Sequence, residues 1–251
     1  MSGNKQITSD TLVDQSYWDS SYSDVAPHMV PESDQLRIWL EKYVAAGNGR
    51  NCLEVGCYPA RYLSVLGELG YTLNGIDLTP RVSELKMSLS QKYPTGEFIH
   101  ADFLSYDNNS AFDLVCSFGF IEHFTNWQEV LIKHAQLVKN NGLLVIETPN
   151  FGGWFQRLIH SWLDNENYKR HNVESMDPKQ WAELIEPLGF EIIRCEYFGR
   201  FEFWSDTKRY TLLQHIGLRL LGKCDPILKK IRPGKRAFSP YCGLIAIRKN
   251  G

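Results

Sequence analysis

Acidic side chains accompany three apolar runs that are spaced like strands of a parallel sheet. Glu54 lies in the run NCLEV, which breaks into the turn GCYPA at 56–60 and restarts as a helical pattern. Asp77 ends the next run, about 21 positions after Gly56, and Asp102 follows the third run. A carboxylate at this spacing accepts hydrogen bonds from a ribose diol in a Rossmann-like unit. We therefore expect a nucleotide-binding crevice.

A histidine that can accept a proton follows the fourth apolar run, FDLVCSFGFIEHF. Gly119 lets the backbone pass close to a ligand, and Glu122 and His123 come directly after it. Ligands bind at the carboxyl ends of strands in open α/β sheets, and histidine takes up protons near neutral pH. His123 is thus a candidate catalytic base, while a local packing role at the start of the next helix stays open.

Each acidic candidate also has a plain structural alternative. Asp77 is predicted to bind ribose, but it could cap the following helix, a role that Thr79 could fill as well. Asp102 could accept a bond from an adenine amino group or stand in an ordinary loop. Phe103 beside it could stack on the base or fill the core.

The elements that must position these residues alternate along the chain. Strand-like runs alternate with helical patterns, which predicts an α/β fold with a parallel sheet and right-handed crossovers. The strand-like runs are 51–55, 71–77, 97–101, 112–118, 143–148, 190–197 and 242–248, and the helical patterns are 32–46, 60–69, 80–92, 126–139 and 178–188. We expect helix stops at 47–49 (GNG), 140–142 (NNG) and Gly189. Residues 150–176 show no clean period.

Composition excludes several classes of protein. The 251 residues suit one large domain or a domain with an added subdomain, and a net charge of −2 gives no reason to expect a nucleic-acid partner. Residues 1–10 are polar and residues 1–16 look loosely ordered, so we see no leader peptide, and no apolar run could span a membrane. The six cysteines form no C-x-x-C pair and are expected as free thiols in the cytoplasm.

The order LEVGC, GID, ADF, FDLVCSFGFIEHF and GLLVIETPN resembles the class I S-adenosylmethionine-dependent methyltransferases. The resemblance covers about 17–148 well and the two final strands more loosely. Within 149–190, it extends to the small-molecule branch of ubiquinone-type and sugar O-methyltransferases. It implies a Rossmann-like sheet of seven strands, mostly parallel with the last strand antiparallel, and helices on both faces.

The resemblance also implies roles for individual residues toward S-adenosyl-L-methionine. Glu54 and Gly56 would hold its methionine part, Asp77 its ribose, and Asp102 and Phe103 its adenine. The remaining cofactor-binding candidates come from an N-terminal cap that closes over the cofactor, or lie beside these motifs: Tyr17, Trp18, Tyr22, Cys57, Leu78, Ser117 and Phe118. Ordinary packing of an N-terminal helix is the alternative for the three aromatic residues of the cap.

The glycine loop departs from the family pattern. Relatives show G-C-G-x-G or G-C-x-P-G, and this chain has Tyr58 and Ala60 instead, while Pro59 matches the second form. A Tyr58 ring that fills the cofactor pocket would favour a degenerate, non-catalytic fold that acts as a binding partner. A ring that points away would leave the enzyme interpretation standing.

Methyl transfer is an in-line displacement, so most of the acceleration comes from alignment, and an alcohol acceptor also needs a base. His123 and His171 are the candidate bases. Because no group of acidic residues and histidines has the spacing of a metal site, we predict no metal. The acceptor is expected to be a small molecule, first a sugar or natural-product hydroxyl and second a quinone-type phenol, whereas RNA is disfavoured.

Residues 206–236 are strongly basic. They hold nine Lys and Arg against two Asp, a net charge of +7 that leaves −9 for the rest of the chain. We divide the chain into an N-terminal cap (1–50), a methyltransferase core (51–199 and 241–251) and a helical insert (200–240). The insert is either a lid or homodimer contact, or it lies against a membrane surface or lipid-linked substrate.

Overall fold

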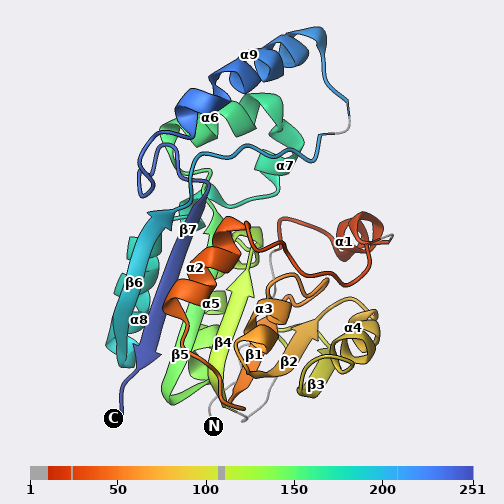
Figure 1. The fold of residues 1–251 in the computed structure, drawn as a ribbon, viewed down its shortest axis with the longest axis vertical. Coiled ribbons are helices and arrows are strands. Elements are labelled where there is room, and N and C mark those ends of the chain that lie inside the picture. The colour runs from red at the N-terminus through yellow and green to blue at the C-terminus, as the bar shows by residue number, and fades with distance from the viewer. Residues whose placement is uncertain (1–10, 24, 107–110, 208, 251) are drawn as a thin grey trace.

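Seven strands form one mixed sheet in the computed structural model, which describes residues 11–23, 25–106, 111–207 and 209–250. The strand order is β3-β2-β1-β4-β5-β7-β6, and β7 runs antiparallel to both of its neighbours (Figure 1). This confirms the predicted sheet with its antiparallel last strand. The strands are β1 Asn51–Val55, β2 Thr72–Asp77, β3 Thr95–His100, β4 Phe112–Phe118, β5 Val138–Pro149, β6 Phe190–Phe198 and β7 Tyr241–Arg248.

Helices cover both faces of the sheet. Helices α2, α3 and α4 contribute to one apolar core, and α5 and α8 contribute to the other. Side chains along the central strands alternate between these cores, as Leu114 and Val115 do, because successive residues of a strand point to opposite faces. The helices are α1 Gln15–Ser21, α2 Gln35–Tyr43, α3 Leu63–Glu68, α4 Val82–Leu89, α5 Trp127–Gln136, α6 Trp154–Leu163, α7 Asn165–Lys169, α8 Pro178–Ile185 and α9 Leu212–Leu228.

Three expectations about local structure were wrong. Helix α3 begins at Leu63 rather than at Ala60, because Ala60 has a left-handed backbone (φ +68°) that no helix continues. Residues 140–142 are not a helix stop but part of β5, which pairs with β4 from Val138 onward. Residues 150–176 contain α6 and α7. The apolar residues of α6 recur at helical spacing, so this signal was present in the sequence and was missed.

A second layer of helices lies beyond the carboxyl ends of the parallel strands (Figure 1). There α6 packs against α9 around a small core of Ile159, Leu163, Phe201 and Leu228. Residues 200–240 therefore fold together with α6, which the predicted division assigned to the core. That division stays a prediction, as does the loose order of residues 1–10, which lie outside the described residues. No helix in the described ranges is long and apolar enough to cross a membrane.

Candidate active site

The turn after β1 requires glycine at its first position. Gly56 has a φ of +70°, and a Cβ built there would lie 2.5 Å from the ring of Phe120. The backbone N–H groups of Gly56 and Cys57 both donate to the Ile76 carbonyl oxygen, at 2.9 and 3.3 Å. These bonds tie the turn to β2, so the loop has a fixed shape at the carboxyl edge of the sheet.

Asp77 organises the same loop from the end of β2. The Tyr58 N–H donates to Asp77 Oδ2 at 2.9 Å, and the Thr79 N–H donates to Asp77 Oδ1 at 3.0 Å. A carboxylate has about four lone-pair positions, so each oxygen keeps one for a ligand. Burial raises the pKa of Asp77. Asp77 does not cap α4, whose N-cap residue is Arg81. It bonds two loop N–H groups instead, which is compatible with binding a ligand.

The Tyr58 side chain forms part of the wall of the site. Its hydroxyl donates to the Val25 carbonyl oxygen at 2.6 Å, and Arg81 lies 4.8 Å from the ring centre. Its ring also contacts the Tyr22 ring edge-on at 5.8 Å. Tyr58 thus joins the glycine loop to the N-terminal segment, and its side chain is buried in the wall of the site.

A cavity of about 260 Å³, the first cavity, opens between this loop and the ends of β2, β3 and β4. Asp102 lines this cavity. Its two carboxylate oxygens also accept hydrogen bonds from Leu104 N–H and Ser105 Oγ–H in the turn that follows β3. Phe103 is buried against His134, so its ring is part of both the cavity wall and the apolar core. The first cavity brings together nine of the predicted residues: Trp18, Tyr22, Gly56, Asp77, Leu78, Asp102, Phe103, Phe118 and His123.

Two predicted residues lie outside the cavities. The Cys57 side chain is fully buried against Gly75, where an added Cβ would come within 2.5 Å of the sulfur. Ser117 is also fully buried, inside the sheet. Neither side chain lines the first cavity or the second cavity described next. The strand and the turn point both side chains into the protein, and their contacts with a cofactor stay a prediction.

A second cavity of about 430 Å³ continues from the first. The two share Gly56, Tyr58, Phe118, Gly119 and His123 in their walls, together with Trp18 and Tyr22 of the N-terminal segment. The predicted residues Tyr17, Glu54 and His171 lie only in the second cavity. Its charged lining is mainly acidic, with two arginines: Asp34, Glu54, Glu122, Glu147, Glu202, Asp206, Arg61 and Arg170.

Three of these carboxyl groups are buried. Glu54 Oε2 and both carboxylate oxygens of Glu122 have no hydrogen-bond partner among the described residues. Burial raises the pKa of Glu54 and of Glu147 well above the usual value, and it raises the pKa of Glu122 to about 8. A buried acceptor without a partner is costly, so these groups favour a cationic or hydrogen-bond-donating ligand.

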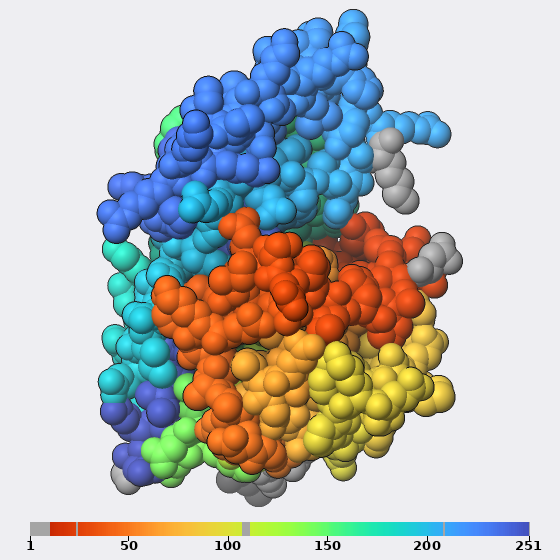
Figure 2. Space-filling model, viewed as in Figure 1, coloured from red at the N-terminus to blue at the C-terminus, as the bar shows by residue number. Residues whose placement is uncertain are grey.

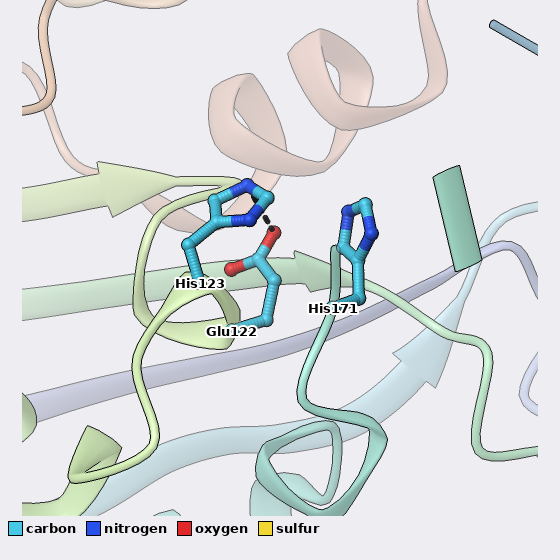
Figure 3. A group of neighbouring side chains, drawn as sticks. All are labelled: Glu122, His123 and His171. Atoms are coloured by element: carbon cyan, nitrogen blue, oxygen red, sulfur yellow. Dashed lines mark ion pairs between the residues drawn. The ribbon is translucent and has the colours of Figure 1, made fainter. Parts of the chain in front are cut away.

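Two histidines from distant parts of the chain meet in the second cavity (Figure 3). The ring centres of His123 and His171 lie 4.7 Å apart. Their Nδ1 atoms lie 3.0 Å from the Arg170 and 2.7 Å from the Asn167 carbonyl oxygens. A carbonyl only accepts, so Nδ1 carries the proton and Nε2 keeps a free lone pair. Burial lowers the pKa of His123 to about 3 and of His171 to about 4, so both rings are neutral at pH 7.

Glu122 completes this group. Its Oε1 lies 3.9 Å from His123 Nε2, and ligand atoms of Glu122, His123 and His171 lie within 4.8 Å of one another (Figure 3). Two imidazoles and a carboxyl are a donor set that also binds zinc. Spacing along the sequence could not reveal this group, because His171 lies 48 positions after His123. The predicted absence of a metal stays a prediction.

The N-terminal aromatic residues close over the site. Trp18 contacts His123 edge-on at 4.9 Å, and Arg170 lies 4.3 Å from the ring centre of Tyr17. Sequence reasoning assigned no role to Arg170, although it precedes the candidate base His171. It also missed Glu147, although this residue stands at the carboxyl end of β5, where the rule that selected Asp77 applies equally.

A Rossmann-like sheet with an antiparallel β7, and a cavity at its carboxyl edge that Asp77 borders and that continues into an acidic cavity, is the arrangement of the class I S-adenosylmethionine-dependent methyltransferases. Comparison with known proteins agrees. Residues 32–194 match the family model of the methyltransferase domain, and the chain belongs to this family.

Individual relatives of this chain are distant from it in sequence. The ubiquinone biosynthesis O-methyltransferase of Thiobacillus denitrificans is 27% identical over 140 residues, which are 53% of this chain and 58% of that protein. The protein of the same name from Rickettsia prowazekii is 27% identical over 148 residues, 56% of this chain and 58% of that one. The chain thus spans less than two thirds of these relatives.

Solved structures share the fold. A SAM-dependent methyltransferase from Archaeoglobus fulgidus superimposes with a TM-score of 0.56 at 21% identity, covering 85% of this chain and 93% of that one. A putative methyltransferase from Bacillus halodurans gives a TM-score of 0.58 at 16% identity, covering 85% and 99%.

The residues present fit S-adenosylmethionine, the cofactor of this class. Asp77 keeps free lone pairs for a ribose diol at the mouth of the first cavity. Glu54 Oε2 lies buried without a partner at the second cavity, where it complements the cationic methionine part. Asp77 would hold the ribose in the middle of the cofactor, and Glu54 would hold its methionine end.

Proposed function

We propose that this protein transfers a methyl group from S-adenosylmethionine to a hydroxyl of a small molecule, in the first place a sugar or natural-product intermediate. The observation that carries the proposal is the histidine pair. Both imidazoles have their Nδ1–H bonded to backbone, so each Nε2 is free to accept the proton that a hydroxyl must lose.

When bound, the cofactor supplies an activated methyl group on sulfur. The chain's own residues then do three things. Gly56 and Asp77 fix the cofactor at the sheet edge, and Trp18 excludes water on the side of the N-terminal segment. His123 or His171 accepts the hydroxyl proton at Nε2 as the C–O bond to the methyl group forms and the bond between methyl carbon and sulfur breaks, which would leave the sulfur as a neutral thioether. An ionised Glu122, 3.9 Å from His123 Nε2, stabilises the imidazolium that results.

The wall of the second cavity supports a polar acceptor. Glu202 and Asp206 enter it from the segment after β6, and Arg170 pairs with Asp206 at 3.0 Å. These carboxylates and Arg170 can form hydrogen bonds with several hydroxyls of one ligand. Trp204 and Tyr241 offer flat apolar faces against which a sugar ring can pack. A quinone-type phenol is the second candidate, favoured by the names of the two ubiquinone relatives.

Calorimetry with S-adenosylhomocysteine and a turnover assay on sugar and phenol acceptors test the proposal. We expect the product to bind, and a methylated hydroxyl to be found by mass spectrometry. The variants His123→Ala and His171→Ala should bind the product and lose at least about a hundredfold in turnover for whichever ring is the base. His28→Ala, an exposed histidine, is the matched control.

Two outcomes would contradict the proposal. Failure to bind the product would favour the non-catalytic fold that acts as a binding partner. Turnover that both alanine variants retain in full would exclude the histidines as bases.

The cytoplasmic location is also a proposal, supported by the cysteines. All six lie in described residues and are free thiols.

A further inference from the structure

Helix α9 carries apolar side chains on two opposite sides. Its inner side, with Gly217 and Leu228, is buried in the small core that it shares with α6. Its outer side is exposed. Residues spaced like one face of a helix form this outer stripe and are each between 46% and 77% exposed: Leu212, Leu213, Ile216, Leu220 and Ile227. In the described part of the chain, nothing covers the stripe.

Helix α6 extends the apolar surface. Trp154, Leu158 and Trp162 recur every four residues and are 65%, 55% and 48% exposed. The Trp162 ring lies against Gly217 of α9, where an added Cβ would be 2.6 Å from it, so the exposed residues of the two helices adjoin there. Helices α6 and α9 stand at the far end of the molecule from the amino ends of the parallel strands (Figure 1), and α9 forms part of its outer rim (Figure 2).

Basic residues are concentrated in α9 and in the segment that follows it. Between residues 212 and 236 there are seven Lys and Arg against Asp225 alone. Arg219 and Lys223 lie on the same side of α9 as the outer stripe and are exposed. Within the described residues, Lys229 and Arg236 form ion pairs, and the other five basic side chains form none. The surface is thus both apolar and cationic.

These properties favour an anionic lipid surface over a second copy of the chain. Two copies joined through this surface would bring like charges together, which opposes association. A helix with exposed Leu and Ile, adjoining Trp and nearby Lys and Arg lies in the plane of a bilayer with its apolar side among the acyl chains. The family match ends at residue 194, so it covers α6 but not α9.

We propose that the exposed face of α6 and α9 docks the protein on a bilayer that contains anionic lipid. The bases contact lipid phosphates, and the outer stripe enters the interface. The segment that leads into α9 contributes Glu202, Trp204 and Asp206 to the second cavity, so docking places that cavity beside the lipid surface.

Co-sedimentation with phosphatidylcholine vesicles, with and without phosphatidylglycerol, tests the proposal. We expect binding only to the anionic vesicles, weakened by salt. The triple variant Leu212→Gln/Leu213→Gln/Ile216→Gln keeps the charge and should lose at least about tenfold in binding. Arg219→Gln/Lys223→Gln should lose roughly tenfold or more, since each base near the surface contributes about fivefold.

Met87→Gln on α4 is the matched control, because this side chain is 67% exposed on another part of the molecule. It should bind vesicles like the wild type. Thermal unfolding and binding of S-adenosylhomocysteine verify that each variant is folded. The proposal is overturned if the wild type ignores anionic vesicles at low salt, or if the triple variant binds as well as Met87→Gln.

Sedimentation velocity tests the alternative that a second copy of the chain covers this surface. A wild-type dimer that the triple variant abolishes would also overturn the proposal, because the surface would then be a subunit interface. Vesicle binding is measured without turnover, so its failure leaves the transferase proposal untouched.

Discussion

Glu122 should make the folded state sensitive to pH in a way that glutamine does not. Burial raises the pKa of Glu122 from 4.5 to about 8. Below pH 4.5 the side chain is neutral in both the folded and the unfolded chain. Between pH 4.5 and 8 the unfolded chain releases a proton that the folded chain retains. The stability contributed by the neutral carboxyl is therefore lost as the pH rises through this window.

The magnitude follows from the difference between the two pKa values. One pKa unit corresponds to about 1.4 kcal/mol, so the change for Glu122 amounts to roughly 5 kcal/mol once the pH exceeds 8. Glu122→Gln keeps the shape of the side chain but cannot ionise. We expect the unfolding free energy of the variant to rise relative to wild type by about 1.4 kcal/mol per pH unit between pH 5 and 8, and then to level off.

Urea unfolding of both proteins at a series of pH values measures this difference. Glu166→Gln, at a side chain that is 78% exposed, is the control for the loss of one negative charge. A difference between Glu122→Gln and wild type that does not change with pH would refute the reasoning. It would mean that Glu122 is ionised in the folded protein at neutral pH.

Four further changes follow from the site. Methyl transfer by the wild type should rise with pH and level off above about 8 as Glu122 ionises, and Glu122→Gln should lack this rise in a pH–rate profile. Gly56→Ala should weaken S-adenosylhomocysteine binding at least about tenfold in calorimetry, because its Cβ would lie 2.5 Å from Phe120 in a left-handed backbone; unchanged affinity would contradict the fit. Tyr58→Phe should cost about 1 kcal/mol in urea unfolding through the lost bond to Val25, with no tightening of product binding. Activity should survive a chelator in full, whereas loss restored by a divalent ion would show that Glu122, His123 and His171 hold a metal.

The sheet could be predicted because its signals are local. The runs 51–55 and 112–118 alternate between two cores and became β1 and β4 with the expected bounds. The helix at 154–163 was missed although its apolar residues recur at helical spacing, so the sequence did carry its signal. What could not be predicted is how Gln156 and His160 are accommodated on its buried face. Polar side chains can be buried there only because tertiary contacts with the segment after β6 satisfy part of them, as the bond from Gln156 to the Phe238 carbonyl does.

The candidate site also has one part that could be predicted from the sequence and one part that could not. Asp77 and Glu122 follow from strand ends, which sequence reveals. The meeting of His123 with His171 depends on how 167–171 folds back over the sheet, which no spacing encodes. The burial of the Cys57 and Ser117 side chains has a related cause. A motif identifies which residues lie near a ligand, but the direction of each side chain is set by the backbone of the strand or turn.

The position of β7 has a consequence for synthesis. This strand, Tyr241–Arg248, lies between β5 and β6, so β6 has no strand partner until β7 has been made. Ribosomes add about 5–20 residues each second, so β6 waits several seconds while residues 199–248 are made. During that time both edges of β6 are open to pairing with other chains. A chaperone that binds nascent chains would protect this strand most usefully in that interval.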